Sequence, residues 1–250
     1  MTSQPLYRLR KQWQRTAATL LIVLSFSVSV HAGFEECPQF FVQGKPPVVQ
    51  PKPMHRELCY SAFAILHSGS TKTPVFVAQR LDRASVDDAD EKRTNKFFAD
   101  ARLRSSERAT LEDYKGSGYS RGHMAPAGDM PTATAMAQSF SLANMVPQDQ
   151  AHNGGPWSKV EQDTRKYASR AKGAVFVITG PVFTANSPSI GANQVKVPTY
   201  LFKLVYDEEK SKAWAHWQEN RSGKQDARPI SYQELVERTG INFLPAGLVK

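Results

Sequence analysis

The sequence predicts an α+β domain in which a central, mostly antiparallel sheet is flanked by helices. β-prone runs recur in both halves of the chain, and a turn-like link at 67–72 joins the first two of them, as in a hairpin. Between and after these runs, apolar side chains recur at helical spacing. The chain shows no internal repeat and no low-complexity tract, so we expect a single domain with one core.

The first 32 residues have the pattern of a targeting segment. Basic residues without an acidic neighbour precede an apolar stretch at about 17–30, which ends in Val30-His31-Ala32. We predict a secretory signal peptide at 1–32, cleaved after Ala32. The protein would then be exported, periplasmic or extracellular, without stable membrane association. The alternative, an uncleaved anchor, would need about 20 apolar residues. The basic residues are Arg8, Arg10, Lys11 and Arg15.

The net charge of the chain bears on the kind of partner that it binds, and its cysteines bear on disulfide and metal sites. Loss of those four basic residues lowers the formal net charge from +9 to +5, which suits an anionic polymer but could equally serve solubility alone. Cys37 and Cys59 are the only two cysteines, and an even pair in an exported chain predicts one disulfide. Two cysteines without a histidine at ligand spacing make a poor zinc site.

The N-terminal half divides into an extension and the start of the domain. Residues 33–56 form a Pro-rich extension whose part from 38 to 56 should be extended and non-helical. The domain proper is expected at 57–250. Strands are predicted at 60–66 and 74–78, with His67 in the turn between them and therefore at the surface. The charged stretch 83–96 lacks the spacing of a calcium loop and is predicted to be a solvated loop.

Helices and further strands follow in the second half. A short helix is predicted at 132–140, with Met136 and Phe140 in the core. A longer helix has Pro156 in its first turn and buries the face of Trp157, Val160, Thr164, Tyr167, Ala168 and Ala171. Strands are predicted at 174–178, 199–206 and 213–218. A final helix at 231–238 begins with Ser231 as N-cap and ends at Gly240.

The chemistry concentrates between residues 118 and 161. Arg121 and His123 stand at i and i+2, so an extended segment presents both to one ligand, and Gly122 between them would let the backbone approach that ligand. Asn153 and Glu161 follow on what is predicted to be the first two turns of a helix. A base, a fixed cation and oxygen ligands for a hard metal are what the hydrolysis of a phosphodiester requires.

Several pieces of this region occur in a known order and spacing. They are Ser120-Arg121-Gly122-His123, Asn144-Met145-Val146-Pro147-Gln148, the trio Asn153, Trp157 and Glu161, and Arg93-Thr94-Asn95-Lys96-Phe97-Phe98-Ala99-Asp100. Together they resemble the DNA/RNA non-specific endonuclease family, the ββα-metal (His-Me finger) nucleases. The resemblance runs from about 58 to 245. One position departs from the family pattern, because Ser120 stands where the family has Asp.

The resemblance implies a role for each matching residue. His123 would be the general base, and Arg121 would stabilise charge on the phosphoryl oxygens. Asn153 would bind one Mg²⁺ (Mn²⁺ being possible), with Glu161 acting through a water, and Asn144 would support the catalytic site. Arg93 would contact substrate phosphate. The structural alternatives are a helix cap for Asn153, an ion pair with Arg165 for Glu161, and a surface ion pair for Arg93.

The predicted function is an endonuclease that cuts DNA and RNA with little sequence preference. Two other functions remain open. One is a catalytically weak or inactive nucleic-acid-binding domain of the same fold, which the Ser120 departure would support. The other is a serine hydrolase, because Gly118-Tyr119-Ser120-Arg121-Gly122 matches a nucleophile elbow, although polar residues before it and Pro126 and Pro131 after it argue against the required strand and helix.

Overall fold

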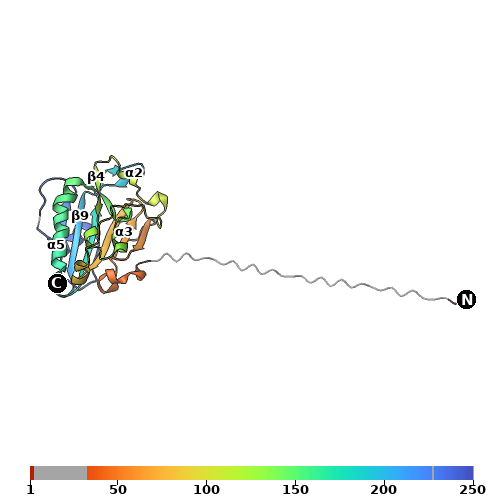
Figure 1. The fold of residues 1–250 in the computed structure, drawn as a ribbon, viewed down its shortest axis with the longest axis horizontal. Coiled ribbons are helices and arrows are strands. Elements are labelled where there is room, and N and C mark those ends of the chain that lie inside the picture. Colours follow the sequence, from red (N-terminus) through yellow and green to blue (C-terminus); the bar gives the residue numbers. More distant parts are fainter. Residues whose placement is uncertain (3–32, 227, 250) are drawn as a thin grey trace. The chain divides into compact units, whose positions relative to one another are not determined.

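A seven-stranded sheet forms the centre of the computed structural model, which describes residues 1–2, 33–226 and 228–249 (Figure 1). Its strand order is β1-β2-β3-β6-β9-β10-β11, and every neighbouring pair is antiparallel. The strands are β1 His55–Cys59, β2 Ala64–Ser68, β3 Thr73–Leu81, β6 Val175–Val182, β9 Tyr200–Asp207, β10 Lys212–Glu219 and β11 Ile230–Ser231. The predicted α+β class and antiparallel sheet are confirmed.

Two smaller ladders and six α-helices surround this sheet in the part of the chain that the structure describes. The ladders are β4 Tyr119–His123 with β5 Met145–Asp149, and β7 Ser189–Ile190 with β8 Val195–Lys196. The helices are α1 Arg83–Asp87, α2 Leu111–Tyr114, α3 Ala133–Ser139, α4 Gln150–His152, α5 Ser158–Ala168 and α6 Tyr232–Thr239. Among the described residues, none of these helices has the length and apolar character needed to cross a bilayer.

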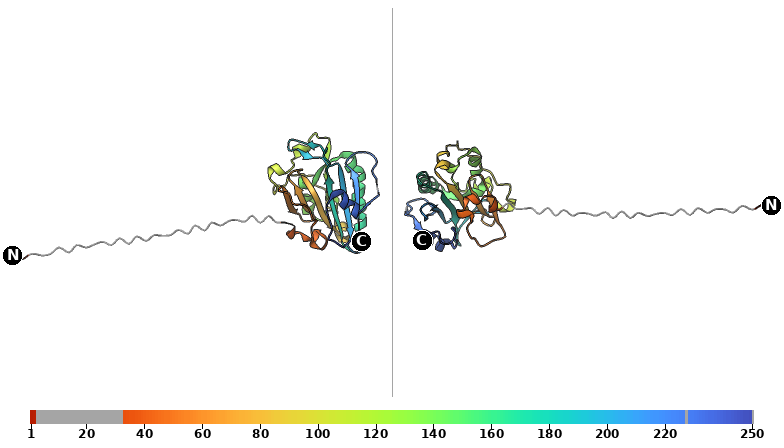
Figure 2. Two further views of the ribbon diagram at one scale, coloured as in Figure 1. Left: turned by 180° about the vertical axis from the view of Figure 1, so that it is seen from behind. Right: turned by 90° about the horizontal axis from the view of Figure 1, so that it is seen from below.

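The strands are apolar on both faces because the sheet is buried between two layers. In β3, Val77 belongs to one core cluster, whereas Phe76 and Ala78 belong to another, as alternation along a strand requires. Ala168 of α5 packs on one face, and Leu235 of α6 packs on the other. We call these the α5 face and the α6 face. Figure 1 shows α5 in front of the sheet, and Figure 2 shows the C-terminal helix in front when the molecule is seen from behind.

Several predicted elements shift in the structure. The hairpin is confirmed as β2 and β3, but the first strand begins at Ala64 instead of 60, after an additional strand β1. The Pro-rich segment is not wholly extended, because short 3₁₀ turns form at Pro38–Phe40 and Val42–Gly44 and carry Phe40 and Val42 into the core. The predicted signal peptide at 1–32 lies outside the described residues apart from its first two.

The structure contradicts the prediction that His67 lies in a surface turn. It lies in β2 with no exposed surface, and its Nε2 contacts the backbone oxygen of Glu107 at 2.9 Å. Its strand continues through a β-bulge at Leu66/His67, so the residue that we expected in a surface turn turns inward instead. Burial lowers the pKa of His67 to about 4.

That buried imidazole should make the fold sensitive to acid. The unfolded chain binds a proton at His67 below pH 6.5, whereas the folded chain resists it down to about pH 4. The stability from this site is therefore full above pH 6.5 and is lost as pH falls toward 4, by about 3 kcal/mol. Urea unfolding at several pH values measures the effect. His67→Gln should flatten this slope, and an unchanged slope would contradict the prediction.

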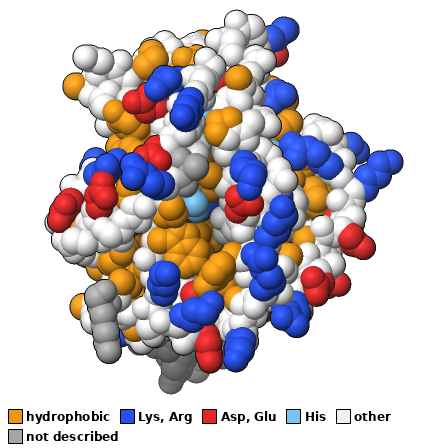
Figure 3. All heavy atoms as spheres, turned by 90° about the vertical axis from the view of Figure 1, so that its left-hand side faces the viewer, with side chains coloured by type: hydrophobic (Ala, Val, Ile, Leu, Met, Phe, Trp, Pro, Cys, Tyr) orange, Lys and Arg blue, Asp and Glu red, His pale blue; other side chains and the backbone are white. Residues whose placement is uncertain are grey.

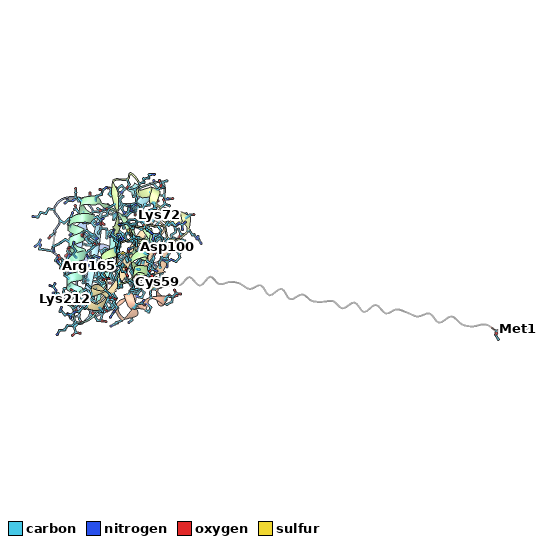
Figure 4. All side chains as sticks on the ribbon, in the orientation of Figure 1. Met1, Cys59, Lys72, Asp100, Arg165 and Lys212 are labelled. Carbon is cyan, nitrogen blue, oxygen red and sulfur yellow. A yellow bond between two sulfur atoms is a disulfide. The ribbon has the colours of Figure 1, made fainter. Side chains whose placement is uncertain are left out.

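The predicted disulfide is confirmed, since Cys37 and Cys59 are bonded with their Cα atoms 5.9 Å apart. It joins the segment before β1 to the end of β1. In Figure 4, Cys59 lies beside the salmon-coloured N-terminal segment of the domain. Phe34 and Phe41 of that segment pack on each other and complete the α6-face core, so the bond fixes a piece of the core and not a loose tail.

Reduction of this bond should cost about 3 kcal/mol of stability, because the unfolded chain regains the freedom of the closed loop. For a domain of this size the melting temperature would fall by roughly 6–12 °C. Calorimetry of the oxidised and reduced protein measures the shift, and the double variant Cys37→Ala/Cys59→Ala should match the reduced form. A difference below about 1 °C would contradict the expected contribution.

Candidate active site

The site is built on two antiparallel strands followed by a helix. In the β4–β5 ladder, His123 pairs with Met145 and Arg121 with Pro147, and β5 leads through α4 into α5. The structure gives a reason for glycine at 122 that the sequence did not indicate. A Cβ there would lie 1.9 Å from Oε1 of Gln148, so the glycine makes room for a side chain of β5.

His123 lies at the end of β4 in an aromatic setting. Its ring packs edge-to-face against Phe140 at 5.1 Å and lies 5.9 Å from Phe97. The residue is 8% exposed, and its Nε2 is buried without a hydrogen-bond partner in the described chain. Burial, and then the nearby charge of Arg93, lower the pKa of His123 to about 3. The imidazole is therefore neutral near pH 7 and free to accept a proton, with Nδ1 left as the nitrogen that can meet a water.

Two guanidinium groups lie on the same aromatic pair. Arg121 is 4.2 Å from the centre of the Phe97 ring, and Arg93 is 4.9 Å from that of Phe140. Arg121 and His123 thus share Phe97, which confirms that they face one side. Arg93 donates to Asn95 at 2.7 Å, and neither arginine forms an ion pair among the described residues. The cation–π contacts fix both cations while leaving their donors available to an anion.

Asn153 and Glu161 lie on an irregular helix. Residues Asn153–Trp157 form a π-helical turn between α4 and α5, so Pro156 lies in that turn instead of the first turn of a regular helix. The N-cap role belongs to Asp149, whose side chain accepts from the His152 amide, whereas Asn153 ends α4 through its backbone amide and leaves its side chain out of the cap. Arg165 pairs with Asp129 at 2.7 Å and not with Glu161. Both structural alternatives are therefore absent.

A buried lysine beneath α5 is part of the site and was missed in the sequence. Lys203 of β9 is 1% exposed on the α5 face, and its ammonium donates to Thr179 at 2.8 Å. Burial raises the pKa of Glu161 to about 7, and the charge of Lys203 is the largest effect opposing this rise. The same burial lowers the pKa of Lys203, and Glu161 is the first group that opposes it. The two side chains are each other's main opposite charge.

A chain of neutral hydrogen bonds ties the helix to the strands. His152 is fully buried, and its two ring nitrogens contact Gln148 at 3.0 Å and Gln218 at 2.9 Å. Asn220 bonds the backbone of Asp149 and Pro147. These contacts hold the start of the helix, and hence Asn153, against both β5 and β10. The sequence suggested none of them, because β10 is joined to the site only by the fold.

Asn144 and Ser120 support the strands instead of facing a substrate. Asn144 has no exposed surface, and its side chain bonds the backbone of Ala125 and Ser139. It therefore fixes the chain just after His123 and is a positioning residue. Ser120 donates to the carbonyl of Gln148 at 2.9 Å within a strand, and β4 does not run into a helix as a nucleophile elbow must. The serine-hydrolase alternative is not supported.

The oxygen atoms that could bind a metal in this site fit a hard cation that takes few protein ligands. The side chains of Asn153 and Glu161 are half-buried and form no hydrogen bond or ion pair among the described residues, so their oxygens are available. No cluster of three or more His, Cys, Asp or Glu that could hold a metal occurs in the described ranges. Oxygen ligands supplemented by waters are what Mg²⁺ prefers. Figure 3 shows Lys and Arg side chains gathered on the side where α5 lies, with a histidine visible between them.

Comparison with known proteins agrees with this geometry. The model of the DNA/RNA non-specific endonuclease family matches residues 47–248. Nuclease EXOG, mitochondrial, of Xenopus laevis is 36% identical over 162 residues, which are 60% of this chain and 45% of that protein. Endonuclease G, mitochondrial, of Homo sapiens is 30% identical over 155 residues, which are 58% and 52%. The chain therefore spans about half the length of these relatives.

A solved structure of the EndoG/EndoGI complex shares the fold, with a TM-score of 0.68, 24% identity, and coverage of 75% of this chain and 84% of that chain. The relatives also correct one prediction. Both are named as mitochondrial nucleases, which overturns the expectation of an exported, periplasmic or extracellular protein. The match of the family model over most of the chain is decisive for the classification: this chain belongs to the DNA/RNA non-specific endonuclease family.

Proposed function

We propose that this chain is a metal-dependent endonuclease that hydrolyses phosphodiester bonds of both DNA and RNA, with His123 as general base and one Mg²⁺ held at Asn153. One observation carries the proposal. A neutral, buried imidazole, whose Nε2 has no hydrogen-bond partner among the described residues, lies beside the same two aromatic rings as two guanidinium groups that form no ion pair there. A structural histidine would normally have its ring nitrogens satisfied, as His152 has.

The residues divide the reaction between them. His123 accepts a proton from the attacking water at Nδ1, since its imidazole is neutral at neutral pH. Arg121, fixed on Phe97, donates to the phosphoryl oxygens as their negative charge grows. Asn153 would hold the metal through its amide oxygen and Glu161 through a water, and the bound metal would neutralise charge on the leaving oxygen. Arg93 would hold a neighbouring phosphate.

The same residues predict which substrates are accepted. The cations at the site are suited to phosphate oxygens, which carry no sequence information, so cleavage should depend little on the base. Phosphate contacts also release counterions, so substrate binding should weaken steeply with salt. Nothing in the proposed contacts distinguishes a ribose from a deoxyribose, which supports both DNA and RNA as substrates.

Cleavage of plasmid DNA and of an RNA of similar length tests this function. Both should be cut with Mg²⁺, and EDTA should abolish both activities. Ser120→Ala should keep activity within about threefold, because the hydroxyl of Ser120 bonds one backbone carbonyl among the described residues, and such a hydrogen bond contributes about 1 kcal/mol. Intact nucleic acid under all metal conditions would instead favour an inactive binding domain, and activity lost in Ser120→Ala alone would point to the serine.

A further inference from the structure

A second concave site lies on the α6 face, away from His123. It is a cavity of about 660 Å³ at the end of the sheet where β6 ends and β9 begins. Tyr200 and Trp217 form its aromatic wall, and both belong to the α6 face because Trp217 pairs with Phe202 of that core. Lys203, which supports the catalytic site, projects from the opposite face of the same strand. The two sites are therefore separated by the sheet.

The aromatic wall is a layered stack with half-buried rings. The ring centres of Tyr200 and Trp217 are 5.2 Å apart with a tilt of 32°, and the guanidinium of Arg238 lies 4.9 Å from the centre of Trp217. Phe183, which follows β6, lines the same cavity. Aromatic rings left half-exposed in a concave site are suited to a planar partner, and Arg238 already occupies such a position on Trp217.

Cations surround the aromatic wall. Arg221, Lys224 and Arg238 line the cavity with two carboxylates, Glu219 and Asp226. Glu219 pairs with Arg221, and Asp226 pairs with Arg228, which lies outside the lining. Lys224 forms no ion pair among the described residues, so it is the cation available to an anionic group. An aromatic wall beside an available ammonium matches a base joined to its phosphate.

We propose that this cavity binds one unpaired nucleotide of a single-stranded segment, with the base stacked on the Tyr200–Trp217 wall and its phosphate near Lys224. This inference rests on the proposed nuclease function, in which nucleic acid is the substrate. A base inside a duplex is covered on both faces by its neighbours, whereas an unpaired base exposes its faces for stacking on the aromatic wall. Stacking is independent of base identity, so the site agrees with cleavage of low sequence preference.

The end of β10 links this cavity to the catalytic site. Trp217 and Glu219 face the cavity, whereas the intervening Gln218 bonds His152 and the following Asn220 bonds the backbone of β5. One short segment therefore supports the metal-binding helix with its alternate residues and forms the cavity wall with the others. Because the cavity binds substrate without touching the reacting phosphate, it should lower KM for substrates with unpaired stretches and leave kcat nearly unchanged.

Tryptophan fluorescence tests the proposal directly, because stacking of a base quenches the ring on which it lies. The full chain carrying His123→Ala, in EDTA, prevents cleavage during titration with a single-stranded (dT)₈ probe. We expect quenching in this background, its loss with Trp217→Phe, and its retention with the matched variant Trp214→Phe. Trp214 lies on the same strand but packs against Tyr167 on the α5 face. Tyr200→Leu should weaken binding of the fluorescein-labelled probe by on the order of tenfold.

Two further probes separate the base from the phosphate. An abasic octamer and a duplex of the same length should leave Trp217 unquenched, since neither offers an unpaired base. Quenching by the abasic octamer, quenching that persists in Trp217→Phe, or binding of (dT)₈ without any quenching would overturn the proposal. So would the absence of binding. Cleavage of duplex DNA by the wild-type chain is measured separately, so failure of the cavity is distinguished from failure of the nuclease function.

Discussion

His123→Ala is expected to lower kcat/KM for both DNA and RNA by roughly 10²–10⁴-fold, the range that a positioned general base contributes. The loss should fall mainly on kcat, because Arg93 and Arg121 still hold phosphate. Folding should survive, since the buried Nε2 of His123 has no hydrogen bond in the described part of the chain that the fold would miss. Initial rates on fluorescently labelled DNA and RNA, together with melting curves, measure the two effects.

Two controls separate catalysis from structural damage in that variant. His55→Ala removes a half-buried histidine on β1, the edge strand of the seven-stranded sheet, which is not part of the β4–β5 ladder that carries the site. The rate should stay within about twofold. Added imidazole should restore part of the activity of His123→Ala, because the deleted ring leaves a space of its own shape beside Phe140. Wild-type rates in His123→Ala would remove this residue from the mechanism and leave the proposed function without its base.

The residues that the sequence predicted best are those that act within one short segment. Arg121 and His123 share a face because they alternate on one strand, and this relation needs no tertiary information. The helix at 133–139 and the N-cap of Ser231 followed from local patterns in the same way. The packing of Gly122 against Gln148 could not be predicted, because Gln148 lies on the neighbouring strand.

The missed residues are those that only the sheet brings together. In the sequence, Lys203 is a charged residue within an otherwise apolar strand. Its position under α5 depends on the antiparallel pairing of β9 with β6. Gln218 lies 66 residues from the histidine that it bonds. His67 shows the opposite error, because a β-bulge redirected a residue that looked like part of a turn. In each case the deciding feature is a contact between different elements of the fold, which a local sequence pattern does not contain.

Glu161→Gln is expected to raise the Mg²⁺ concentration needed for half-maximal activity by roughly 10–100-fold, the usual cost of losing a group that orients a metal ligand shell. The substitution keeps the shape of the side chain and removes its charge. It also leaves the buried ammonium of Lys203 without its main opposite charge, so some loss of stability should accompany the weaker metal binding. Calorimetric titration with Mg²⁺ and activity at varied Mg²⁺ measure the two consequences independently.

Asp163→Asn is the matched control for that variant. Asp163 lies two residues further along the same helix, is more exposed, and pairs with Lys159 at the surface. It loses the same charge at nearly the same place in the chain, so its Mg²⁺ requirement should change less than about threefold. If both variants weaken Mg²⁺ binding equally, the effect comes from the loss of one negative charge anywhere on α5, and Glu161 has no specific role. If only Glu161→Gln does so, the carboxylate acts at the metal, and Lys203 beneath it is part of the same electrostatic arrangement.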